Sequence, residues 1–321
     1  MPAPAHANGR ARWIDVTRDL NPLADLLALA FPDLDEEGRA ALRQLRRIAR
    51  SRRAQRMYAR QEVPGAPLYG FVWEAENRIV GNVSLVALPV RPKQYLIVNV
   101  ATHPDYRRQG IARELMHRAI AYAQRKKAAA IWLQVDTYNR GAIALYENLG
   151  FQARDVVTQW QAQRGNPAAL EAPASGLKIR PGLVRRKEWP QQRAWLEAIY
   201  PADRRWNAPC RPWDVFAPTW QGWLQRLLRP SALCKQWVAR RGEQLRGAAL
   251  WLPRHGGATE ALMLAAPPDL AADDVAALLA PVCTRARRPL RAELPQGFLA
   301  EGLTAAGFLP KRHLLWMKKT L

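Results

Sequence analysis

Cysteine is scarce in this sequence: three residues, Cys210, Cys234 and Cys283, lie far apart among 321. Their odd number and wide spacing exclude a disulfide framework and match no zinc-binding spacing. No run of about 18 consecutive apolar residues occurs, which excludes a transmembrane helix. Residues 1–10 also lack the apolar segment of a secretory signal. The sequence therefore predicts a cytoplasmic protein that binds no metal and inserts into no membrane.

Acidic residues are few relative to basic ones. Lys and Arg together number 49, Asp and Glu 27, and the formal net charge is +22. A surface of this sign attracts polyanions such as nucleic acid, anionic lipid or phosphorylated cofactors. The basic residues occur in both halves of the chain, however. An arginine-rich composition of the whole sequence explains the same charge without any such partner.

The length and one stretch of unusual composition predict two domains. At about 150 residues per domain, a chain of this length suggests two, and 49% hydrophobic residues suffice for a core in each. Residues 164–177 are rich in Pro, Gly and Ala, which is typical of a linker. We therefore expect one domain over residues 11–163 and a second over residues 178–321.

The pattern of the first domain predicts a mixed α/β fold, in which helices flank a central sheet. Strands are expected over residues 12–18, 68–74, 78–88, 95–102, 129–135 and 151–163. Helices are expected over residues 23–31, 36–60, 110–127 and 139–149. A similar order of strands and helices recurs after residue 177, which predicts an internal duplication.

One loop in the first domain has the composition of a phosphate-binding site. Residues 98–112, VNVATHPDYRRQGIA, predict a strand, a turn, and a basic loop that opens a helix. Free backbone N–H groups at a helix N-terminus bind phosphate, and the helix dipole adds to this. Gly110 leaves room for a pyrophosphate to approach the backbone. Three arginines supply charge-assisted contacts: Arg107, Arg108 and Arg113.

This loop resembles the acetyl-CoA pyrophosphate loop of the GCN5-related N-acetyltransferases, the GNAT family. A second segment of the family's signature follows at residues 133–151, LQVDTYNRGAIALYENLGF. The resemblance covers about residues 11–163. It implies the GNAT fold and the transfer of an acetyl group from acetyl-CoA to an amine within a ternary complex, without a metal.

The resemblance also implies roles for the matching residues. A strand segment that lines the pantetheine and polarises the thioester carbonyl corresponds to Val100, Ala101 and Thr102. The cradle of the pyrophosphate corresponds to Arg107, Arg108, Gln109, Gly110, Ile111, Ala112 and Arg113. Asn139 matches a position that contacts the pantetheine or the end of the cofactor. Tyr146 matches a general acid, because a nearby phenol can reprotonate a departing thiolate whose pKa is about 8.5.

The sequence departs from the family at the residue that takes a proton from the amine. Many relatives carry a glutamate on the strand before the loop, whereas residues 95–100 hold no carboxylate. Asn99 can at most orient a water or the acceptor. The remaining candidate bases are His103, a carboxylate elsewhere such as Glu74, and water alone.

The second half contains a reduced form of the same signature. Pro268-Asp269 aligns with Pro104-Asp105, but no arginine follows. Three further positions align as follows: Asp274 with Gly110, Leu303 with Tyr146, and Gln296 with Asn139. An aspartate at a helix N-terminus repels phosphate. The resemblance therefore implies a tandem protein whose second domain is a degenerate copy without a cofactor site, and which packs beside the first to shape the acceptor groove.

Two functions from different classes fit this sequence. The first is an acetyl-CoA-dependent N-acetyltransferase whose acceptor is a small amine, an aminosugar or an amino group of a protein. The second is a non-catalytic, acetyl-CoA-binding regulatory module that docks nucleic acid through its basic surface. Its candidate contacts with nucleic acid are the arginines of residues 43–60. On the simpler interpretation, these arginines only form the solvent-exposed face of a helix. Tryptophans within residues 206–223 either line a binding cleft or pack into a core.

Overall fold

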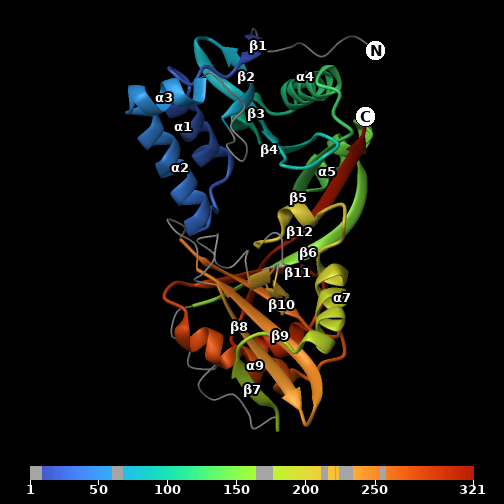
Figure 1. The fold of residues 1–321 in the computed structure, drawn as a ribbon. Coiled ribbons are helices and arrows are strands. Elements are labelled where there is room, and N and C mark those ends of the chain that lie inside the picture. The colour runs from blue at the N-terminus through green and yellow to red at the C-terminus, as the bar shows by residue number, and fades with distance from the viewer. Residues whose placement is uncertain are drawn as a thin grey trace. The chain divides into compact units, whose positions relative to one another are not determined.

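The computed structural model divides the chain into two compact units (Figure 1). Unit 1 comprises Met1–Asp155 and Leu315–Leu321, and unit 2 comprises Val156–Leu314. The structure describes residues 9–59, 68–163, 176–210, 216–220, 222–223, 234–253 and 258–321. Most of the expected linker, residues 164–175, lies outside these ranges. Within them, no helix is long and apolar enough to cross a membrane.

Unit 1 is a mixed sheet with helices on both faces. The strand order is β1-β2-β3-β4-β5-β12, in which β1 to β4 are antiparallel neighbours and β4 pairs with β5 in parallel. The strands are β1 (Gly9–Trp13), β2 (Tyr69–Ala75), β3 (Arg78–Ala87), β4 (Gln94–Thr102), β5 (Ala130–Asp136) and the end of β12 (Leu309–Thr320). The helices are α1 (Leu20–Ala30), α2 (Glu36–Ala49), α3 (Arg52–Ala59), the 3-10 helix η1 (Pro104–Tyr106), α4 (Ile111–Arg125) and α5 (Arg140–Asn148).

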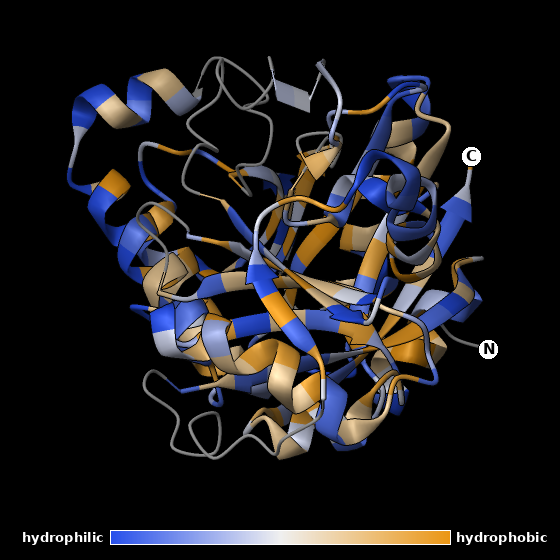
Figure 2. Cartoon of the chain, turned by 60° about the horizontal axis from the view of Figure 1, so that its bottom comes forward, coloured by the Kyte–Doolittle hydropathy of each residue, from blue (hydrophilic) through white to orange (hydrophobic). Residues whose placement is uncertain are grey.

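The two faces of this sheet bury separate hydrophobic clusters. Phe71 and Trp73 of β2 pack in the cluster that contains Leu115 of α4. Val72, between them, packs in the cluster that contains Leu23 of α1. This division follows from the alternation of side chains along a strand. The colouring in Figure 2 shows apolar and polar residues interspersed along the strands and helices in the same way.

A glycine on β3 lets α4 lie close to the sheet. A Cβ atom at Gly81 would lie 2.6 Å from Cγ2 of Ile111 and 3.1 Å from Cδ1 of Leu115. We therefore expect Gly81→Ala to lower the free energy of unfolding by about 1–3 kcal/mol, because an added methyl overpacks this contact. Denaturant unfolding measures the loss. Gly141→Ala is the control, since nothing lies within 4 Å of a Cβ there and alanine favours its helix; an equal loss in both variants would contradict the close approach.

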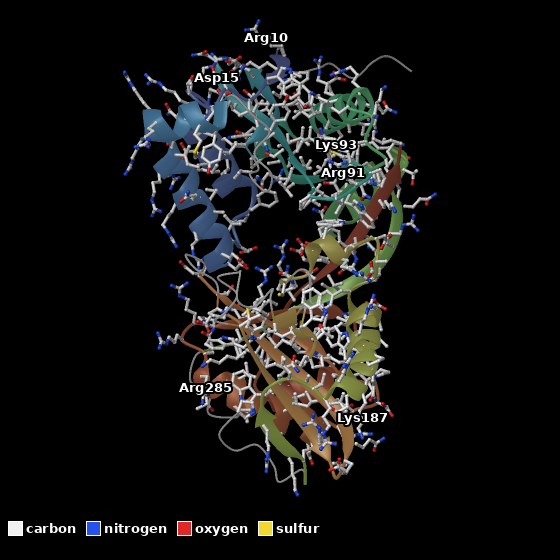
Figure 3. All side chains as sticks on the ribbon, in the orientation of Figure 1. Arg10, Asp15, Arg91, Lys93, Lys187 and Arg285 are labelled. Carbon is white, nitrogen blue, oxygen red and sulfur yellow. The ribbon has the colours of Figure 1, made fainter. Side chains whose placement is uncertain are left out.

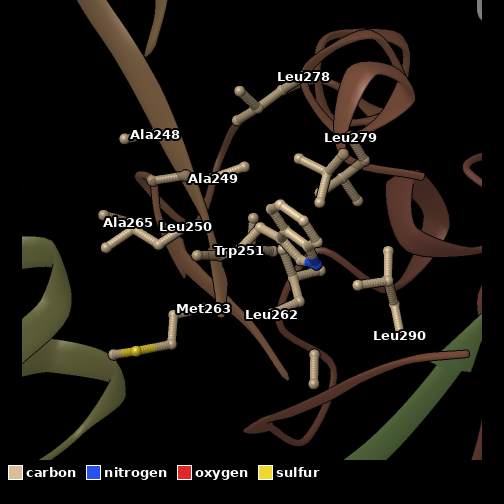
Figure 4. Close-up of a cluster of buried hydrophobic side chains, with 14 of the residues drawn as sticks. Ala248, Ala249, Leu250, Trp251, Leu262, Met263, Ala265, Leu278, Leu279 and Leu290 are labelled. Carbon is tan, nitrogen blue, oxygen red and sulfur yellow. The ribbon is translucent and has the colours of Figure 1, made fainter. Parts of the chain in front are cut away.

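Unit 2 contains a sheet with the order β6-β11-β10-β9-β8-β7. Its strands are β6 (Gln152–Ala162), β7 (Lys178–Pro181), β8 (Lys235–Arg241), β9 (Gln244–Leu252), β10 (Glu260–Ala265) and β11 (Leu290–Pro295). The helical elements are η2 (Arg186–Glu188), α7 (Trp189–Ile199), η3 (Arg205–Asn207), α9 (Ala272–Arg285) and α10 (Ala300–Ala305). Its core gathers side chains of β9, β10 and α9, among them Leu250, Leu262 and Leu278 (Figure 4).

Each unit completes its sheet with a strand from the other half of the sequence. The sequence predicts that residues 151–163 close the first domain. The structure differs: β6 pairs antiparallel with β11, from Leu290↔Ala162 to Pro295↔Val157. The end of β12 takes the corresponding place beside β5 in unit 1. An apolar strand pattern does not encode which sheet edge the strand joins, and successive strands are neighbours only about two-thirds of the time.

Two local structures recur at equivalent places and support the predicted duplication. The first hairpin of unit 1 joins β2 and β3, and that of unit 2 joins β8 and β9. In both, the register shifts between the second and third residue pairs before the turn. The third pair is Trp73↔Gly81 in unit 1 and Ala239↔Gly247 in unit 2. The helix after the fifth strand ends in the same motif. The N–H of Phe151 donates to the carbonyl of Tyr146 at 3.0 Å, and that of Phe308 donates to the carbonyl of Leu303 at 2.9 Å.

Two expected elements have different bounds in the structure. The strand expected over residues 12–18 ends at Trp13, because Asp15 forms a turn in which its Oδ1 accepts from the N–H of Thr17 at 2.9 Å. The single helix expected over residues 36–60 is divided into α2 and α3. Ser51 starts the second helix, since its Oγ accepts from the N–H of Ala54 at 3.3 Å.

Candidate cofactor site

A bulge interrupts β4 at the centre of unit 1. Ser84 of β3 pairs with Val98, but Asn82 pairs with Ala101, so β4 contains one residue more than β3 between these pairs. Asn99 lies in this segment with a φ of 56°. Asparagine is one of the few residues other than glycine that adopts this left-handed conformation readily. The sequence at this point therefore permits a bulge that a β-branched residue would resist.

Beyond the bulge, β4 and β5 separate. Their parallel pairs run from Gln94↔Ala130 to Ile97↔Leu133, and no later pair joins them in the described residues. The backbone of Val100–Thr102 consequently has no partner strand on the β5 side. An extended ligand with amide groups can pair with such a strand edge through main-chain hydrogen bonds. Val100, Ala101 and Thr102 lie at the end of β4 on this edge, and the side chain of Ala101 is buried beneath α1 and α2.

The loop after β4 forms an anion-binding arrangement of backbone N–H groups. Arg108 has a φ of 64° and Gly110 a φ of 80°. Gly110 is the N-cap of α4, and no side chain caps this helix. The first backbone hydrogen bond of the helix runs from the N–H of Glu114 to the carbonyl of Gly110. The N–H groups of Ile111–Arg113 are therefore left for a ligand, at the positive end of the helix dipole.

The arginines of this loop carry uncompensated charge. Arg107, Arg108 and Arg113 are exposed, and none has an acidic partner among the described residues. By contrast, Arg118 one turn further along α4 is bonded to Glu114 at 2.8 Å. Gln109 is engaged locally, because its Nε2 donates to the carbonyl of Asp105 at 3.3 Å. The three loop arginines are available to an anion at the helix N-terminus.

Asn139 and Tyr146 lie on α5, which follows β5. Asn139 is the N-cap of α5, and its Oδ1 accepts from the N–H of Ala142 at 3.1 Å. The side chain that the resemblance assigns to the cofactor thus also holds the start of a helix. Tyr146 is 6% exposed and shares its hydrophobic cluster with Ile111 of α4. The two helices that follow the separating strands therefore meet in one core.

Burial sets the protonation state of Tyr146. Loss of solvation raises the pKa of its phenol to about 12, because an apolar environment disfavours the charged form. The hydroxyl consequently remains protonated throughout the physiological range. A protonated phenol can donate a proton but cannot accept one as a base.

Two of the candidate bases are already engaged. Nε of Arg12 donates to Glu74 at 2.7 Å, and Nη1 and Nη2 of the same guanidinium donate to Asp19. The hydrogen bond from Arg12 lowers the pKa of the Glu74 carboxyl, which makes it a weaker base. Nδ1 of His103 accepts from the N–H of Asp105 at 3.3 Å. These contacts make Glu74 a weaker base and occupy Nδ1 of His103, but they exclude neither side chain as the proton acceptor.

We expect Glu74→Gln to reduce stability in a pH-dependent way and to leave cofactor binding unchanged. The pKa of Glu74 is lower in the folded than in the unfolded chain, so its ion pair stabilises the fold above about pH 4.3. This stability is lost as the pH falls through the folded-state pKa. The free energy of unfolding should fall by about 1 kcal/mol at pH 7, and the deficit should shrink below pH 4. Urea unfolding at both pH values measures this, and a deficit independent of pH would contradict it.

The corresponding loop of unit 2 is shorter and acidic. Helix α9 begins at Ala272, four residues after Pro268, whereas α4 begins seven residues after Pro104. The sequence alignment of Asp274 with Gly110 is therefore wrong, because the loop lost residues that an ungapped alignment retains. Asp274 lies in the first turn of α9, 2% exposed, and both its oxygens accept from Nη2 of Arg241 at 2.9 and 3.0 Å.

Two backbone features of the unit 1 site are missing from the described part of unit 2, whereas two others recur there: β10 and β11 separate after Ala261↔Arg291, and no side chain caps α9. No residue between Ala265 and Ala272 has a positive φ. The pairs between β9 and β10 run without a register shift, from Ala248↔Ala265 to Leu252↔Ala261. Unit 2 therefore has neither the bulge nor the left-handed loop residues within its described part.

Basic side chains are distributed over both units. Figure 3 labels Arg10, Arg91 and Lys93 in unit 1 and Lys187 and Arg285 in unit 2. On α2, Arg46 is paired with Asp25 at 2.8 Å, and Glu36 pairs with two arginines. Around the start of α3, four exposed arginines have no acidic partner among the described residues: Arg50, Arg52, Arg53 and Arg56. Arg60, at the end of the predicted cluster, lies outside the described residues.

The tryptophans of residues 206–223 do not behave as one group. Trp206 is buried, and its Nε1 donates to the carbonyl of Asp203 at 3.0 Å. Trp220 and Trp223 are 71% and 59% exposed. Trp213 lies outside the described residues. The first of these side chains fits the interpretation as core, whereas the two exposed ones do not.

Comparison with known proteins gives matches over the segment that contains this site. Residues 40–151 match the model of the acetyltransferase (GNAT) family. The [ribosomal protein bS18]-alanine N-acetyltransferase of Escherichia coli K12 is 46% identical over 55 residues, which are 17% of this chain and 37% of that protein. Human N-acetyltransferase 8 is 32% identical over 87 residues, 26% of this chain and 37% of that protein. The chain thus spans little more than a third of the length of these relatives.

Solved structures match the chain over nearly its whole length. A tandem GNAT protein from the clavulanic acid biosynthesis pathway aligns with 97% of this chain and 98% of its own, with a TM-score of 0.55 and 16% identity. A GCN5-related N-acetyltransferase from Sphaerobacter thermophilus aligns with 98% of this chain and 96% of its own, with a TM-score of 0.62 and 16% identity. At this identity the likeness concerns the fold, and it includes the duplicated architecture.

Proposed function

Because this chain is a member of the acetyltransferase (GNAT) family by its match over residues 40–151, we propose that it is an acetyl-CoA-dependent N-acetyltransferase. Unit 1 carries the activity. The observation that supports this most directly is the combination of a bulged strand that separates from its neighbour and, after it, an uncapped helix opened by the left-handed residues Arg108 and Gly110. Acetyl-CoA has amide groups that can pair with the strand edge, and a pyrophosphate that can bind at the helix N-terminus.

The residues of unit 1 divide the binding of acetyl-CoA between them. The backbone of Val100–Thr102 pairs with the pantetheine and polarises the thioester carbonyl. The N–H groups of Ile111–Arg113, with the three loop arginines, hold the pyrophosphate. Asn139 contacts the cofactor from the start of α5. Acetyl-CoA supplies the activated acyl group, and the protein mainly positions it against the acceptor.

The transfer is a direct displacement. The acceptor nitrogen forms a bond to the acetyl carbon, the bond from that carbon to sulfur breaks, and the thiolate takes a proton from Tyr146. The pKa of about 12 keeps the phenol of Tyr146 protonated for this step. The proton released by the amine passes to water, and the Tyr146 phenolate takes a proton back from solvent, which restores the phenol for the next turnover.

Unit 2 is proposed to bind no cofactor. Asp273 and Asp274 place negative charge at the start of α9, where a pyrophosphate would be repelled. The ion pair between buried Asp274 and exposed Arg241 further occupies this helix terminus. Its contribution to activity is then structural, because the chain runs from unit 2 into the end of β12, which completes the sheet of unit 1.

Calorimetric titration of the full chain with acetyl-CoA tests this proposal. We expect saturable binding with one site per chain, followed by thiol release when a panel of primary amines is added. The panel should include small amines, aminosugars and peptides with free amino termini. Two sites per chain would contradict the assignment of unit 2. An absence of binding would refute the acetyltransferase function.

The alternative function is a regulatory module that binds acetyl-CoA and docks nucleic acid. It is favoured by the four unpaired, exposed arginines around the start of α3. RNA and DNA binding should then weaken steeply between 50 and 200 mM salt. Charge reversal at Arg52, Arg53 and Arg56 should abolish it, whereas reversal of Arg118 on α4 should not. Acetyl transfer to any amine of the panel would count against this alternative.

A further inference from the structure

A buried amide on β3 holds the bulge in β4. Asn82 is 0% exposed, and its Nδ2 donates to the backbone carbonyl of Asn99 at 2.7 Å. Asn99 is the left-handed residue of the bulge, and no residue of β3 pairs with it. A carbonyl displaced from the strand ladder needs another partner when it is buried. The Asn82 side chain supplies that partner.

Unit 2 provides a natural comparison for this interaction. The shared hairpin register, in which Gly81 corresponds to Gly247, makes Ala248 the counterpart of Asn82. Ala248 pairs with Ala265 in a strand pair that has no register shift. The unit with the amide has the bulge, whereas the unit with alanine at this place has a regular antiparallel pair. The parallel strands separate in both units, since β10 and β11 pair only at Glu260↔Leu290 and Ala261↔Arg291, so the amide accompanies the bulge and not the separation. The difference of one side chain thus accompanies the difference between the two strands.

We propose that Asn82 is a positioning residue for acetyl transfer. It fixes the carbonyl of Asn99 and with it the bulge, which presents the backbone of Val100 to the thioester. This role adds a positioning residue to the proposed acetyl transfer and depends on that proposed function. The Oδ1 atom of Asn82 has no partner among the described residues. An incompletely satisfied buried amide is unfavourable for stability, so stability of the fold does not account for this residue.

The first test compares Asn82→Ala with Ser84→Ala. Ser84 is equally buried on the same strand, and its Oγ accepts the second, longer bond of the Asn82 amide at 3.2 Å. We expect Asn82→Ala to accelerate amide hydrogen exchange at residues 98–101 about tenfold and to raise the Kd for acetyl-CoA about tenfold. Ser84→Ala should change neither quantity. Wild-type exchange and affinity in Asn82→Ala would overturn the inference.

The second test uses the pH dependence of Asn82→Asp. A protonated aspartic acid can donate its hydroxyl to the carbonyl of Asn99, whereas the carboxylate repels that oxygen. Burial raises the pKa of such a carboxyl towards neutrality. The ratio of variant to wild-type Kd should therefore be near one at pH 5 and rise about tenfold by pH 8. A residue that only filled space would give a ratio independent of pH.

The outcomes separate this inference from the proposed function. If the wild type bound no acetyl-CoA, the proposed function would fail, and the exchange rates at residues 98–101 would still decide whether Asn82 holds the bulge. If Asn82→Ala did not fold by circular dichroism, the pH series of Asn82→Asp would decide. A flat ratio between pH 5 and 8, with acetyl-CoA binding intact in the wild type, would refute the role of Asn82.

Discussion

Gly110→Asp should abolish acetyl-CoA binding while the protein remains folded. Gly110 is the N-cap of α4 at a φ of 80° and leaves the N–H groups of Ile111–Arg113 without a capping side chain. An aspartate at an N-cap accepts hydrogen bonds from these N–H groups itself and repels a pyrophosphate. We expect the Kd measured by calorimetry to rise at least about a hundredfold, which corresponds to about 2.7 kcal/mol.

Two control variants separate charge from backbone strain in this experiment. Gly110→Asn has nearly the same size and tolerates the left-handed conformation, but it adds no charge and should weaken binding less. Gly242→Asp places the same residue at another glycine with positive φ, 58°, where nothing lies within 4 Å of a Cβ. It should leave the Kd unchanged. Equal affinity of wild type and Gly110→Asp would remove the α4 terminus from the cofactor site.

Local patterns in the sequence predict most elements of the fold. Helix α5 occupies residues 140–148, one residue inside the expected range of 139–149 at each end. Strand β5 and helix α4 differ from their expected ranges by at most two residues at either end. These elements have signals within a few residues of their own bounds: periodic apolar positions, and Gly150 as a C-terminal cap with a φ of 82°.

The features that the sequence does not predict depend on contacts between distant residues. The exchange of β6 and β12 is decided by which sheet edge each strand meets. The bulge in β4 depends on Asn82, seventeen positions before Asn99. One signal for it was present: Asn82 and Ser84 are polar residues in the otherwise apolar strand RIVGNVSLVA. Buried polar residues in such a strand indicate a specific partner.

The same distinction applies to the candidate site. The loop residues and the uncapped helix follow from a local motif, and the structure places them as expected after β4. The base does not follow from a motif, because its pKa depends on neighbours such as Arg12, which lies 62 positions before Glu74. The sequence left Glu74 open as a base. The ion pair that lowers its pKa is visible only in the folded chain.

Tyr146→Phe should reduce kcat about 100–1,000-fold and leave the Kd for acetyl-CoA unchanged. The substitution removes only the hydroxyl, and general acid catalysis contributes roughly this factor. The side chain is buried against the core of unit 1, so phenylalanine fits the same space. Thiol release from acetyl-CoA with a saturating amine measures kcat, and calorimetry measures the Kd.

The pKa of Tyr146 adds a prediction about the pH profile of this reaction. Because desolvation raises that pKa to about 12, the wild-type phenol keeps its proton and the rate should not decline between pH 8 and 10 through loss of the acid. The control is Tyr138→Phe, a tyrosine before α5 that is 78% exposed and should be dispensable. A rate of Tyr146→Phe equal to that of the wild type would exclude Tyr146 as the donor and leave water to protonate the thiolate.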